Sequence, residues 1–354
     1  MRVLRRAYPE NGVMPRFLRM MMSCAAAGLL AVAAPAAHAA ESRPELAADA
    51  RAFVQDMVER HGFERSALER ALRNTKFLTS IVRAMDAPST ALPWHEFRAR
   101  HITEARINGG LRFWAENAAV LDRAAAEYRV SPEIMVATIG IETLFGRLTG
   151  NVNVFDALTT LAFGDPRRAD FFRGELEQFL LLTRENGWGL NSVKGSFAGA
   201  IGVPQFLPSS YRKYAVDFDG DGRRDLRQVT DAIGSVANYY RQFGWQQDAP
   251  VIVPADVGNT ALEPLLGAGL LPHTSVAEFR KRGVVPLELV ADDALASLIS
   301  VETEGGTRYW LGLNNFYVIT RYNRSINYAM VVQELAWTLR QQRLRAAGTV
   351  PDTP

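Results

Sequence analysis

Apolar residues recur at intervals of three and four from Pro44 to Arg129. Segments such as LAADARAFVQDMVERHG and FERSALERALRNT alternate turns rich in Ala, Leu and Phe with turns rich in Arg and Glu. This spacing places the apolar side chains on one face of a helix and the mixed charges on the solvated face. The pattern therefore predicts an N-terminal helical region over residues 40–130.

A strong helix-start signal follows in VSPE, at residues 130–133. A hydrophobic residue, an N-cap serine, a proline at the first helical position and an acid in the first turn all favour a helix that begins there. We expect this helix to carry Glu142 and to end near Gly146. Apolar periodicity predicts further helices at residues 169–183, 209–214, 231–243 and 326–345.

The pattern changes between Pro250 and Tyr322, where short segments are rich in β-branched and aromatic residues. Turns with Gly, Pro or Asn separate these segments, which is typical of strands. We expect strands in VIVPADV, PLELV, ALASLISVET, TRYWLGL and FYVITRY. The chain is therefore predicted to be mainly α, with a small β-rich insertion at residues 249–322 and a C-terminal helix at 323–346 that packs on the core.

The first 39 residues have the composition of a secretory signal peptide. Arg16 and Arg19 precede the apolar run MMMSCAAAGLLAVAAPAAHAA, which ends in the small-residue pattern AHA. Cleavage there would leave a mature chain that begins near residue 40. A lipid-anchored form is the less favoured alternative, because the MMS before Cys24 matches poorly the Leu-small-small pattern of a lipoprotein acceptor.

The charge of the chain argues against nucleic acid as a partner. The whole chain has a formal charge of +2, and removal of residues 1–39 takes away five arginines and one glutamate, which leaves −2. A protein that binds nucleic-acid phosphates, or a membrane surface through polybasic segments, needs a clear excess of basic residues. The five histidines also show no spacing typical of a metal site.

Glu142 is the only charged residue in the apolar segment IMVATIGIET at residues 134–143. A helix that is apolar on nearly every side is buried, and burial raises the pKa of a carboxyl group. Ile139 and Phe145, three positions to either side, are expected to supply the apolar surroundings. A carboxylic acid that stays neutral near pH 7 can protonate a glycosidic oxygen. The alternative is that Glu142 lies on a narrow exposed stripe or pairs with Arg147.

The segment KGSFAGAIGVPQFLPSSY combines glycines, uncharged polar groups and aromatic residues. The glycines allow tight turns and close approach of the backbone to a ligand. Ser196 and Gln205 offer hydrogen-bonding groups, and flat apolar faces are expected from Phe197, Phe206 and Tyr211. This mixture suits a sugar better than a phosphate. The alternative is a glycine-rich turn packed under a helix.

A second catalytic carboxylate is missing near both segments. Glycosidases with paired carboxylates hold the two groups about 5 to 9 Å apart. No Asp or Glu occurs at residues 143–155 or 186–216. If Glu142 is catalytic, we expect it to act without a carboxylate nucleophile.

The segment DFDGDGRRD, which begins at Asp217, has the spacing of an EF-hand-like calcium loop. Acids stand at loop positions one, three, five and nine, with glycine at six and a backbone carbonyl at seven. Position twelve is Gln228, where a bidentate glutamate is expected. Asp231, three residues further on, is the candidate that closes the site. The alternative is an ordinary Asp/Gly turn.

Taken together and in this order, these motifs resemble the membrane-bound lytic murein transglycosylase B family of bacterial cell-wall enzymes. The densest matches are GIETLFGR, DALTTLAFGDPRRADFFRGELEQFLLL, KGSFAGAIGVPQFLPSSYRKYAVDFDGDG, DAIGSVANYYRQFGW and NNFYVITRYNRSINYAM. The resemblance implies a lysozyme-like catalytic core over residues 131–248, in a periplasmic enzyme that cleaves peptidoglycan.

By this resemblance Glu142 is the single catalytic acid/base, and no cofactor takes part in the reaction. It protonates the oxygen between N-acetylmuramic acid and N-acetylglucosamine, then helps the muramyl C6 hydroxyl attack C1 to give a 1,6-anhydro end. The glycan groove is expected to include Ser196, Gln205, Tyr239, Tyr322 and Asn323.

The resemblance also implies a structural calcium ion, held by Asp217, Asp219, Asp221, the Arg223 carbonyl and Asp231. Glycan strands of peptidoglycan are the implied partner, and complexes for wall synthesis or secretion are further candidates. Two alternatives remain open for the function. One is a hydrolytic muramidase that uses water, and the other is an inactive glycan-binding scaffold in a wall-remodelling complex.

Overall fold

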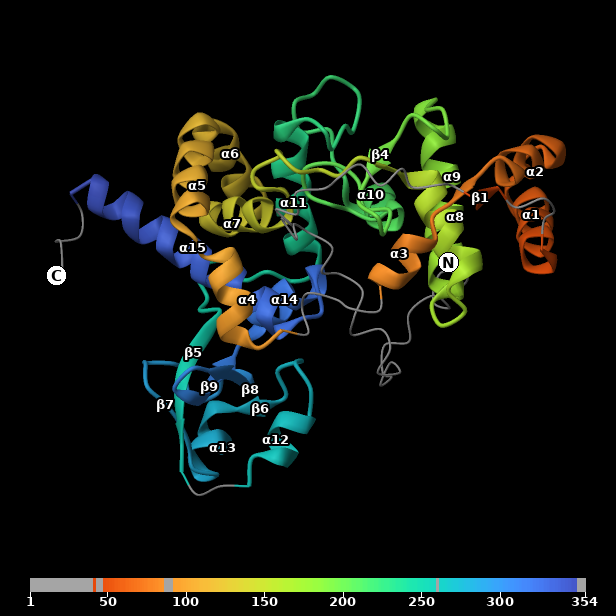
Figure 1. Ribbon diagram of the computed structural model, residues 1–354. Helices are drawn as coiled ribbons and strands as arrows, with labels where there is room; N and C mark the ends of the chain where they lie inside the picture. Colours follow the sequence, from red (N-terminus) through yellow and green to blue (C-terminus); the bar gives the residue numbers. More distant parts are fainter. Residues whose placement is uncertain (1–40, 43–46, 86–91, 259–260, 349–354) are drawn as a thin grey trace.

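The computed structural model describes residues 41–42, 47–85, 92–258 and 261–348, and most of them are helical (Figure 1). The predicted signal peptide, with Cys24, lies outside the described residues. The first helices are α1 (Ala48–His61), α2 (Arg65–Arg73), α3 (Thr79–Ala84), α4 (Trp94–His101), α5 (Glu104–Glu116), α6 (Ala118–Tyr128), α7 (Pro132–Thr143), α8 (Val154–Gly164) and α9 (Ala169–Asn186). The later helices are α10 (Pro208–Tyr214), α11 (Val229–Gln242), α12 (Glu263–Gly267), α13 (Val276–Lys281), α14 (Asn314–Tyr322) and α15 (Ile326–Ala346). None of these described helices has the length and apolar character required to cross a membrane.

Helix α7 lies within the larger hydrophobic core. Every residue from Ile134 to Thr143 is buried, and α5, α6, α11 and α15 pack around the helix. Pro132 stands in the first turn, where its missing N–H leaves no helical hydrogen bond unmade. The helix ends three residues before the predicted Gly146, because Leu144 and Phe145 adopt left-handed backbone with φ of 49° and 63°.

The helices of residues 40–130 divide between two parts of the core. Helices α1 to α3 lie beside α8 and α9, and Arg60 and His61 of α1 contact Glu177 of α9 at 2.7 and 2.9 Å. Strand β1 (Glu41–Ser42) pairs with β2 (Lys76–Phe77) in the same part. Helices α5 and α6 instead pack against α7, and α4 contacts α15.

The insertion contains a five-stranded antiparallel sheet in the order β6-β8-β9-β5-β7, which lies at one side of the helical core and contacts α4 and α15 through β8 (Figure 1). Its strands are β5 (Ile252–Val257), β6 (Thr274–Ser275), β7 (Val284–Pro286), β8 (Leu295–Thr303) and β9 (Gly306–Gly312). Apolar residues of α12, α13 and the sheet form a second, smaller core.

Two strand predictions in this region are wrong. Strand β7 ends at Pro286, so PLELV is not a strand beyond its first residue. The next partner on β5 is Pro254, which accepts from the Leu287 N–H at 2.8 Å but has no N–H to return. The segment FYVITRY forms helix α14, with Phe316, Ile319 and Tyr322 buried at a helical spacing of three. The β propensity of aromatic and β-branched residues is a weak preference that packing overrides here.

A short strand pair brings the glycine-rich segment to the end of α7. Strand β3 (Val152–Asn153) pairs with β4 (Lys194–Gly195), and α8 and α9 fill the chain between them. After β4 the chain folds back through bridges from Gly195 to Ile201 and from Ile201 to Phe206. The Thr143 hydroxyl donates to the Val203 carbonyl at 2.8 Å, which ties this loop to the last residue of α7.

Candidate active site

Glu142 lies buried in the last turn of α7 with only 4 % of its surface exposed. The Tyr328 hydroxyl, from α15, donates to Glu142 Oε1 at 2.6 Å. Burial raises the pKa of Glu142 to about 8, and the Tyr328 hydrogen bond partly opposes that rise. The carboxyl group is therefore predominantly protonated at pH 7, which is the state that a general acid requires.

The surroundings of Glu142 differ from the prediction in one respect. Phe145 does not continue the helix face, because the chain has already turned into left-handed backbone. Its ring lies against Gly140, where a Cβ atom would come within 2.6 Å of the ring, so the close approach requires glycine. The predicted alternative of an ion pair with Arg147 is wrong, because Arg147 is exposed and its Nε donates to the Leu144 carbonyl at 3.2 Å.

Four tyrosines from three helices form a buried cluster beside Glu142. Neighbouring rings lie with centroids 4.9 to 6.2 Å apart among Tyr239, Tyr240, Tyr322 and Tyr328. Burial and the nearby negative charge of Glu142 raise the pKa of Tyr322 and of Tyr328 well above the usual value. Both phenols therefore remain neutral hydrogen-bond donors over the physiological pH range.

The hydroxyls of the other three tyrosines form hydrogen bonds that hold neighbouring segments together: two donate to backbone carbonyls and one bonds to a threonine of α7. Tyr239 donates to the Arg321 carbonyl at 2.6 Å, and Tyr322 donates to the Pro204 carbonyl of the glycine-rich loop. Tyr240 shares a 2.7 Å hydrogen bond with Thr138 of α7. Tyr239 and Tyr322, both predicted groove residues, are 4 % and 3 % exposed, so the rings themselves form wall rather than open surface.

Tyr328 and Tyr240 were not identified from sequence as site residues. The available signal was weak: Tyr328 follows the N-cap Ser325 by three residues and opens the apolar stretch YAMVV. Asn323, which was identified, is buried at the junction between α14 and α15, where its N–H donates to the Ile319 carbonyl at 3.4 Å.

The polar residues of the glycine-rich segment shape the loop from within. Ser196 Oγ accepts from the Ala198 and Ala200 N–H groups at 3.3 and 3.1 Å. Gln205 stands in left-handed backbone with φ of 52°, and its Nε2 donates to the Thr149 and Gly202 carbonyls at 3.0 and 2.9 Å. Ser196 is buried with 7 % of its surface exposed, and Gln205 is half-buried. After these bonds the Ser196 proton and the Gln205 carbonyl oxygen retain hydrogen-bonding capacity.

The expectation of open aromatic faces on this segment is wrong for two residues. Phe206 and Tyr211 are 2 % and 1 % exposed. The Tyr211 hydroxyl is enclosed by backbone, since it donates to the Arg224 carbonyl and accepts from the Leu226 N–H at 3.1 Å. Both rings therefore belong to the core, and only Phe197 is half-buried.

The aspartate loop between α10 and α11 brings three predicted calcium ligands together. Carboxylate oxygens of Asp217, Asp219 and Asp231 lie within 4.8 Å of one another. Asp231 is buried in the first turn of α11 and accepts from the N–H groups of residues 218, 219 and 225 at 2.7 to 3.2 Å. Asp217 accepts from the N–H groups of residues 220 to 222 at 2.8 to 3.1 Å.

The remaining predicted loop residues are placed differently. Asp221 lies outside the group of three, and its carboxylate accepts from the Arg223 N–H at 2.8 Å. Asp225, at position nine, pairs with Arg227 at 2.8 Å. Three converging carboxylates provide the hard oxygen donors that calcium prefers, so the residues present fit the ion.

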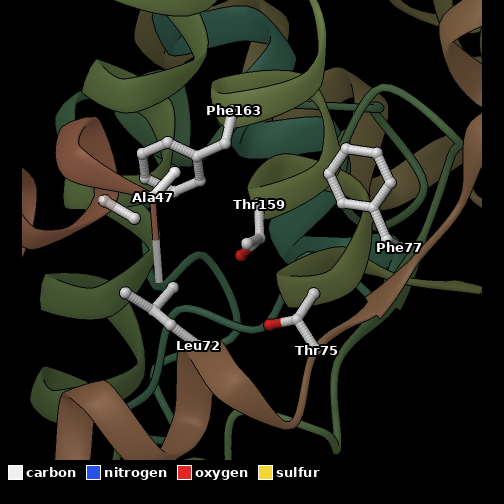
Figure 2. A pocket seen from close by; sticks show the side chains of 7 residues that line it. Ala47, Leu72, Thr75, Phe77, Thr159 and Phe163 are labelled. Carbon is white, nitrogen blue, oxygen red and sulfur yellow. The ribbon is translucent and has the colours of Figure 1, made fainter. Parts of the chain in front are cut away.

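A small cavity lies between α1, α2, β2 and α8. Figure 2 shows the Thr75 and Thr159 hydroxyls and the Phe77 and Phe163 rings around it. Its volume of about 20 Å³ is enough for one water molecule and for no sugar. None of the predicted site residues lines it.

The chain matches the family model for the transglycosylase SLT domain over residues 45–337. It is 41% identical over 307 residues to membrane-bound lytic murein transglycosylase B of Escherichia coli (strain K12), and the match covers 84% of both chains. The solved structure of soluble lytic transglycosylase SltB1 from Pseudomonas aeruginosa is 45% identical with a TM-score of 0.77, over 83% of this chain and 99% of that chain.

Two further solved structures carry ligands. Escherichia coli lytic transglycosylase Slt35 in complex with calcium is 42% identical with a TM-score of 0.76, over 84% of this chain and 94% of that chain. SltB3 from Pseudomonas aeruginosa in complex with NAG-NAM-pentapeptide is 30% identical with a TM-score of 0.71, over 82% and 78%. The resemblance and the mainly α, lysozyme-like fold predicted from sequence are confirmed. The chain therefore belongs to the SLT-domain family of peptidoglycan lytic transglycosylases.

Proposed function

We propose that Glu142 is the single acid/base that cleaves the β-1,4 bond between N-acetylmuramic acid and N-acetylglucosamine. The observation that carries this proposal is its buried carboxyl group, whose pKa is raised to about 8. Burial rather than a neighbouring charge causes that rise, which agrees with the lack of any Asp or Glu at residues 143–155 and 186–216. A second carboxylate would be needed for the paired-carboxylate mechanism.

Glu142 first donates its proton to the glycosidic oxygen, and the bond from that oxygen to muramyl C1 breaks. The resulting carboxylate accepts the proton of the muramyl C6 hydroxyl while the C6 oxygen forms a bond to C1. The product is a 1,6-anhydro end, no water is consumed, and Glu142 regains its proton. Because Tyr328 donates to Oε1, the proton is transferred at Oε2.

Ser196, Gln205, Tyr239, Tyr322 and Asn323 are proposed to form the glycan groove around Glu142. Ser196 and Gln205 have hydrogen-bonding capacity left after their loop contacts, so they would contact the acetamido and hydroxyl groups of the sugars. Tyr322 would act by holding the glycine-rich loop against α14, through its bond to Pro204.

Mass spectrometry of the fragments released from purified peptidoglycan sacculi tests the reaction. Fragments that end in 1,6-anhydromuramic acid, lighter by one water than hydrolysis products, are expected from the chain lacking residues 1–39. Reducing ends would instead establish a muramidase. Lack of release by folded protein would favour the glycan-binding scaffold.

A calcium ion is proposed to stabilise the aspartate loop. Asp217, Asp219 and Asp231 would supply carboxylate oxygens, with Asp221 and the Arg223 carbonyl completing the shell. Binding only the folded state, the ion would raise the melting temperature by mass action. A chelator should therefore lower the melting temperature of the wild type, and Asp217→Ala should remove that dependence. A wild-type melting temperature indifferent to both calcium and chelator would remove the support for the site.

The enzyme is proposed to act in the periplasm after cleavage of the signal peptide at residues 1–39. Peptidoglycan strands would be its main partner, and assemblies for wall synthesis or secretion could recruit it. Fractionation of cells that express the whole chain tests this location. Recovery of the protein in the cytoplasm, with residues 1–39 intact, would contradict it.

A further inference from the structure

A second hollow of about 320 Å³ lies at the end of α7 opposite to Glu142. Its walls come from the junction of α6 and α7, from α15 and from the loop after α11. Glu133, in its wall, and Glu142 are roughly 13 Å apart along the axis of α7, at about 1.5 Å per residue. None of the residues proposed for catalysis, the glycan groove or calcium lines this hollow.

Guanidinium groups dominate the charge of this pocket. Arg340 of α15 pairs with Glu133 at 3.4 Å. Arg343 lies over the Trp114 ring at 4.5 Å, and Arg129 donates to the Gln247 side chain at 3.0 Å. Within the described ranges neither Arg129 nor Arg343 forms an ion pair, and both are exposed.

We propose that this pocket binds the stem peptide of peptidoglycan through the carboxylates of that peptide. The inference rests on the proposed function, because a strand of that substrate carries such peptides. Arg129 and Arg343 have forked donors that match a carboxylate, and among the described residues neither is held in an ion pair. The volume is at the lower end of pockets that hold small ligands, which suits a few peptide residues.

The acids in the wall narrow the choice of ligand. Glu133 and Asp248 line the pocket together with the three arginines. They would repel a polyanion and attract an ammonium group, so the pocket favours a ligand that carries both charges with an excess of carboxylates. A stem peptide with a diamino acid has this character, whereas a glycan strand offers no charge for the arginines to recognise.

The pocket and Glu142 would bind different parts of the peptidoglycan. Between them lies α7, whose residues from Ile134 to Thr143 are all buried. A peptide attached to the sugar beside Glu142 would have to pass around this buried helix to reach the pocket, whereas a peptide on a neighbouring strand would not. The pocket is therefore assigned to the stem peptide of a neighbouring glycan strand. Binding of that peptide would hold the enzyme on cross-linked peptidoglycan.

Calorimetric titration of the mature protein with a free stem tetrapeptide tests the assignment. The wild type should bind the peptide, and Arg129→Gln/Arg343→Gln should weaken the affinity by at least about tenfold, as expected for loss of charge-assisted hydrogen bonds. Arg345→Gln, in the same last turn of α15 but outside the pocket, is the matched control and should bind like the wild type. The same peptide with amidated carboxylates should not bind.

Three outcomes would overturn the assignment. They are absence of peptide binding by the wild type, equal affinity in the double variant, and displacement of the peptide by an equal concentration of inorganic phosphate. Thermal melting of each variant verifies that it is folded. Turnover of glycan strands stripped of peptides should be unchanged in the double variant. Failure of the proposed function would appear separately, as loss of anhydro ends with peptide binding intact.

Discussion

The end of α7 and the aspartate loop both bury a carboxylate, but they surround it differently. Glu142 lies among apolar and aromatic side chains and receives one hydrogen bond, from Tyr328. Asp231 accepts three backbone N–H groups. Burial raises the pKa of both, but to about 8 only for Glu142. Deep burial with a single donor favours the neutral form of Glu142, whereas three backbone donors favour the ionised form of Asp231, so burial and donor number act together.

Glu175 is an intermediate case on α9. It is buried, and its carboxylate accepts from the Ser209 N–H and hydroxyl at 2.9 and 2.6 Å. The carboxylate thereby supplies an acceptor to the Ser209 N–H, one of the first-turn N–H groups of α10 that have no partner within the helix. Burial raises the pKa of Glu175 and the two Ser209 bonds partly oppose that rise. Both carboxylate oxygens are used to hold α10, which gives Glu175 a structural role.

The largest expected effect is on turnover, which should depend on Glu142 and not on Glu175. Glu142→Gln should lower turnover of sacculi by about 10²- to 10⁴-fold, because it removes the proton donor and leaves the shape of the site. Glu175→Gln, the matched control, should retain turnover per folded molecule. A Glu142→Gln protein with near wild-type turnover would remove Glu142 from the acid/base role.

For the free energy of unfolding, the larger loss is expected in the aspartate loop and not at Glu142. Asp231→Ala should lower the free energy of unfolding by at least about 3 kcal/mol, because three N–H groups lose their acceptor at a buried site. Asp221→Ala should lower the free energy of unfolding by less, since Asp221 is exposed and its carboxylate accepts from the nearby Arg223 N–H at the loop surface. Denaturant unfolding in excess chelator measures both without the contribution of calcium. Equal losses would show that the buried hydrogen bonds of Asp231 do not carry the difference.

Replacement of Glu142 should also stabilise the protein at high pH. The folded pKa of about 8 lies above the ordinary value of 4.5, so burial costs stability as the pH rises from 4.5 to 8 and costs nothing below that window. Glu142→Gln should therefore gain up to about 3 kcal/mol at pH 7, at about 1.4 kcal/mol per pH unit. Melting temperatures at pH 4 and pH 8 measure this gain. A gain that does not grow with pH would contradict the raised pKa.

The smallest expected effect concerns the hydrogen bond from Tyr328. Because this bond lowers the pKa of Glu142, Tyr328→Phe should move the alkaline limb of the pH–rate profile upward by about one unit. Tyr239→Phe is the control, because its hydroxyl donates to the Arg321 carbonyl. A limb that stays in place in Tyr328→Phe would mean that the bond does not tune the acid.

Local patterns predicted the elements whose structure depends on neighbours in sequence. The helix start at VSPE and the burial of Glu142 both follow from short-range composition, and both are found in α7. The spacing of the aspartate loop likewise anticipated that Asp231 would approach Asp217, which it does. The departures at Phe145 and in FYVITRY arise where a left-handed turn or tertiary packing overrides the local preference.

The contact that tunes the acid could not be predicted in this way. Tyr328 reaches Glu142 across 186 positions of sequence, because α15 packs on α7. No short-range pattern specifies such a pair. Tyr322 was identified from resemblance, yet its hydroxyl is directed to the Pro204 carbonyl and its ring is buried.

Direct titration of Glu142 tests the central claim most closely. Carbon-detected NMR of protein labelled at the glutamate side-chain carboxyl would follow each signal with pH, and Glu142→Gln would identify the signal of interest by its loss. We expect a midpoint near 8, set by burial and moderated by Tyr328. A midpoint near the ordinary value of 4.5 would show that Glu142 is ionised at neutral pH, and the account of it as the proton donor would be contradicted.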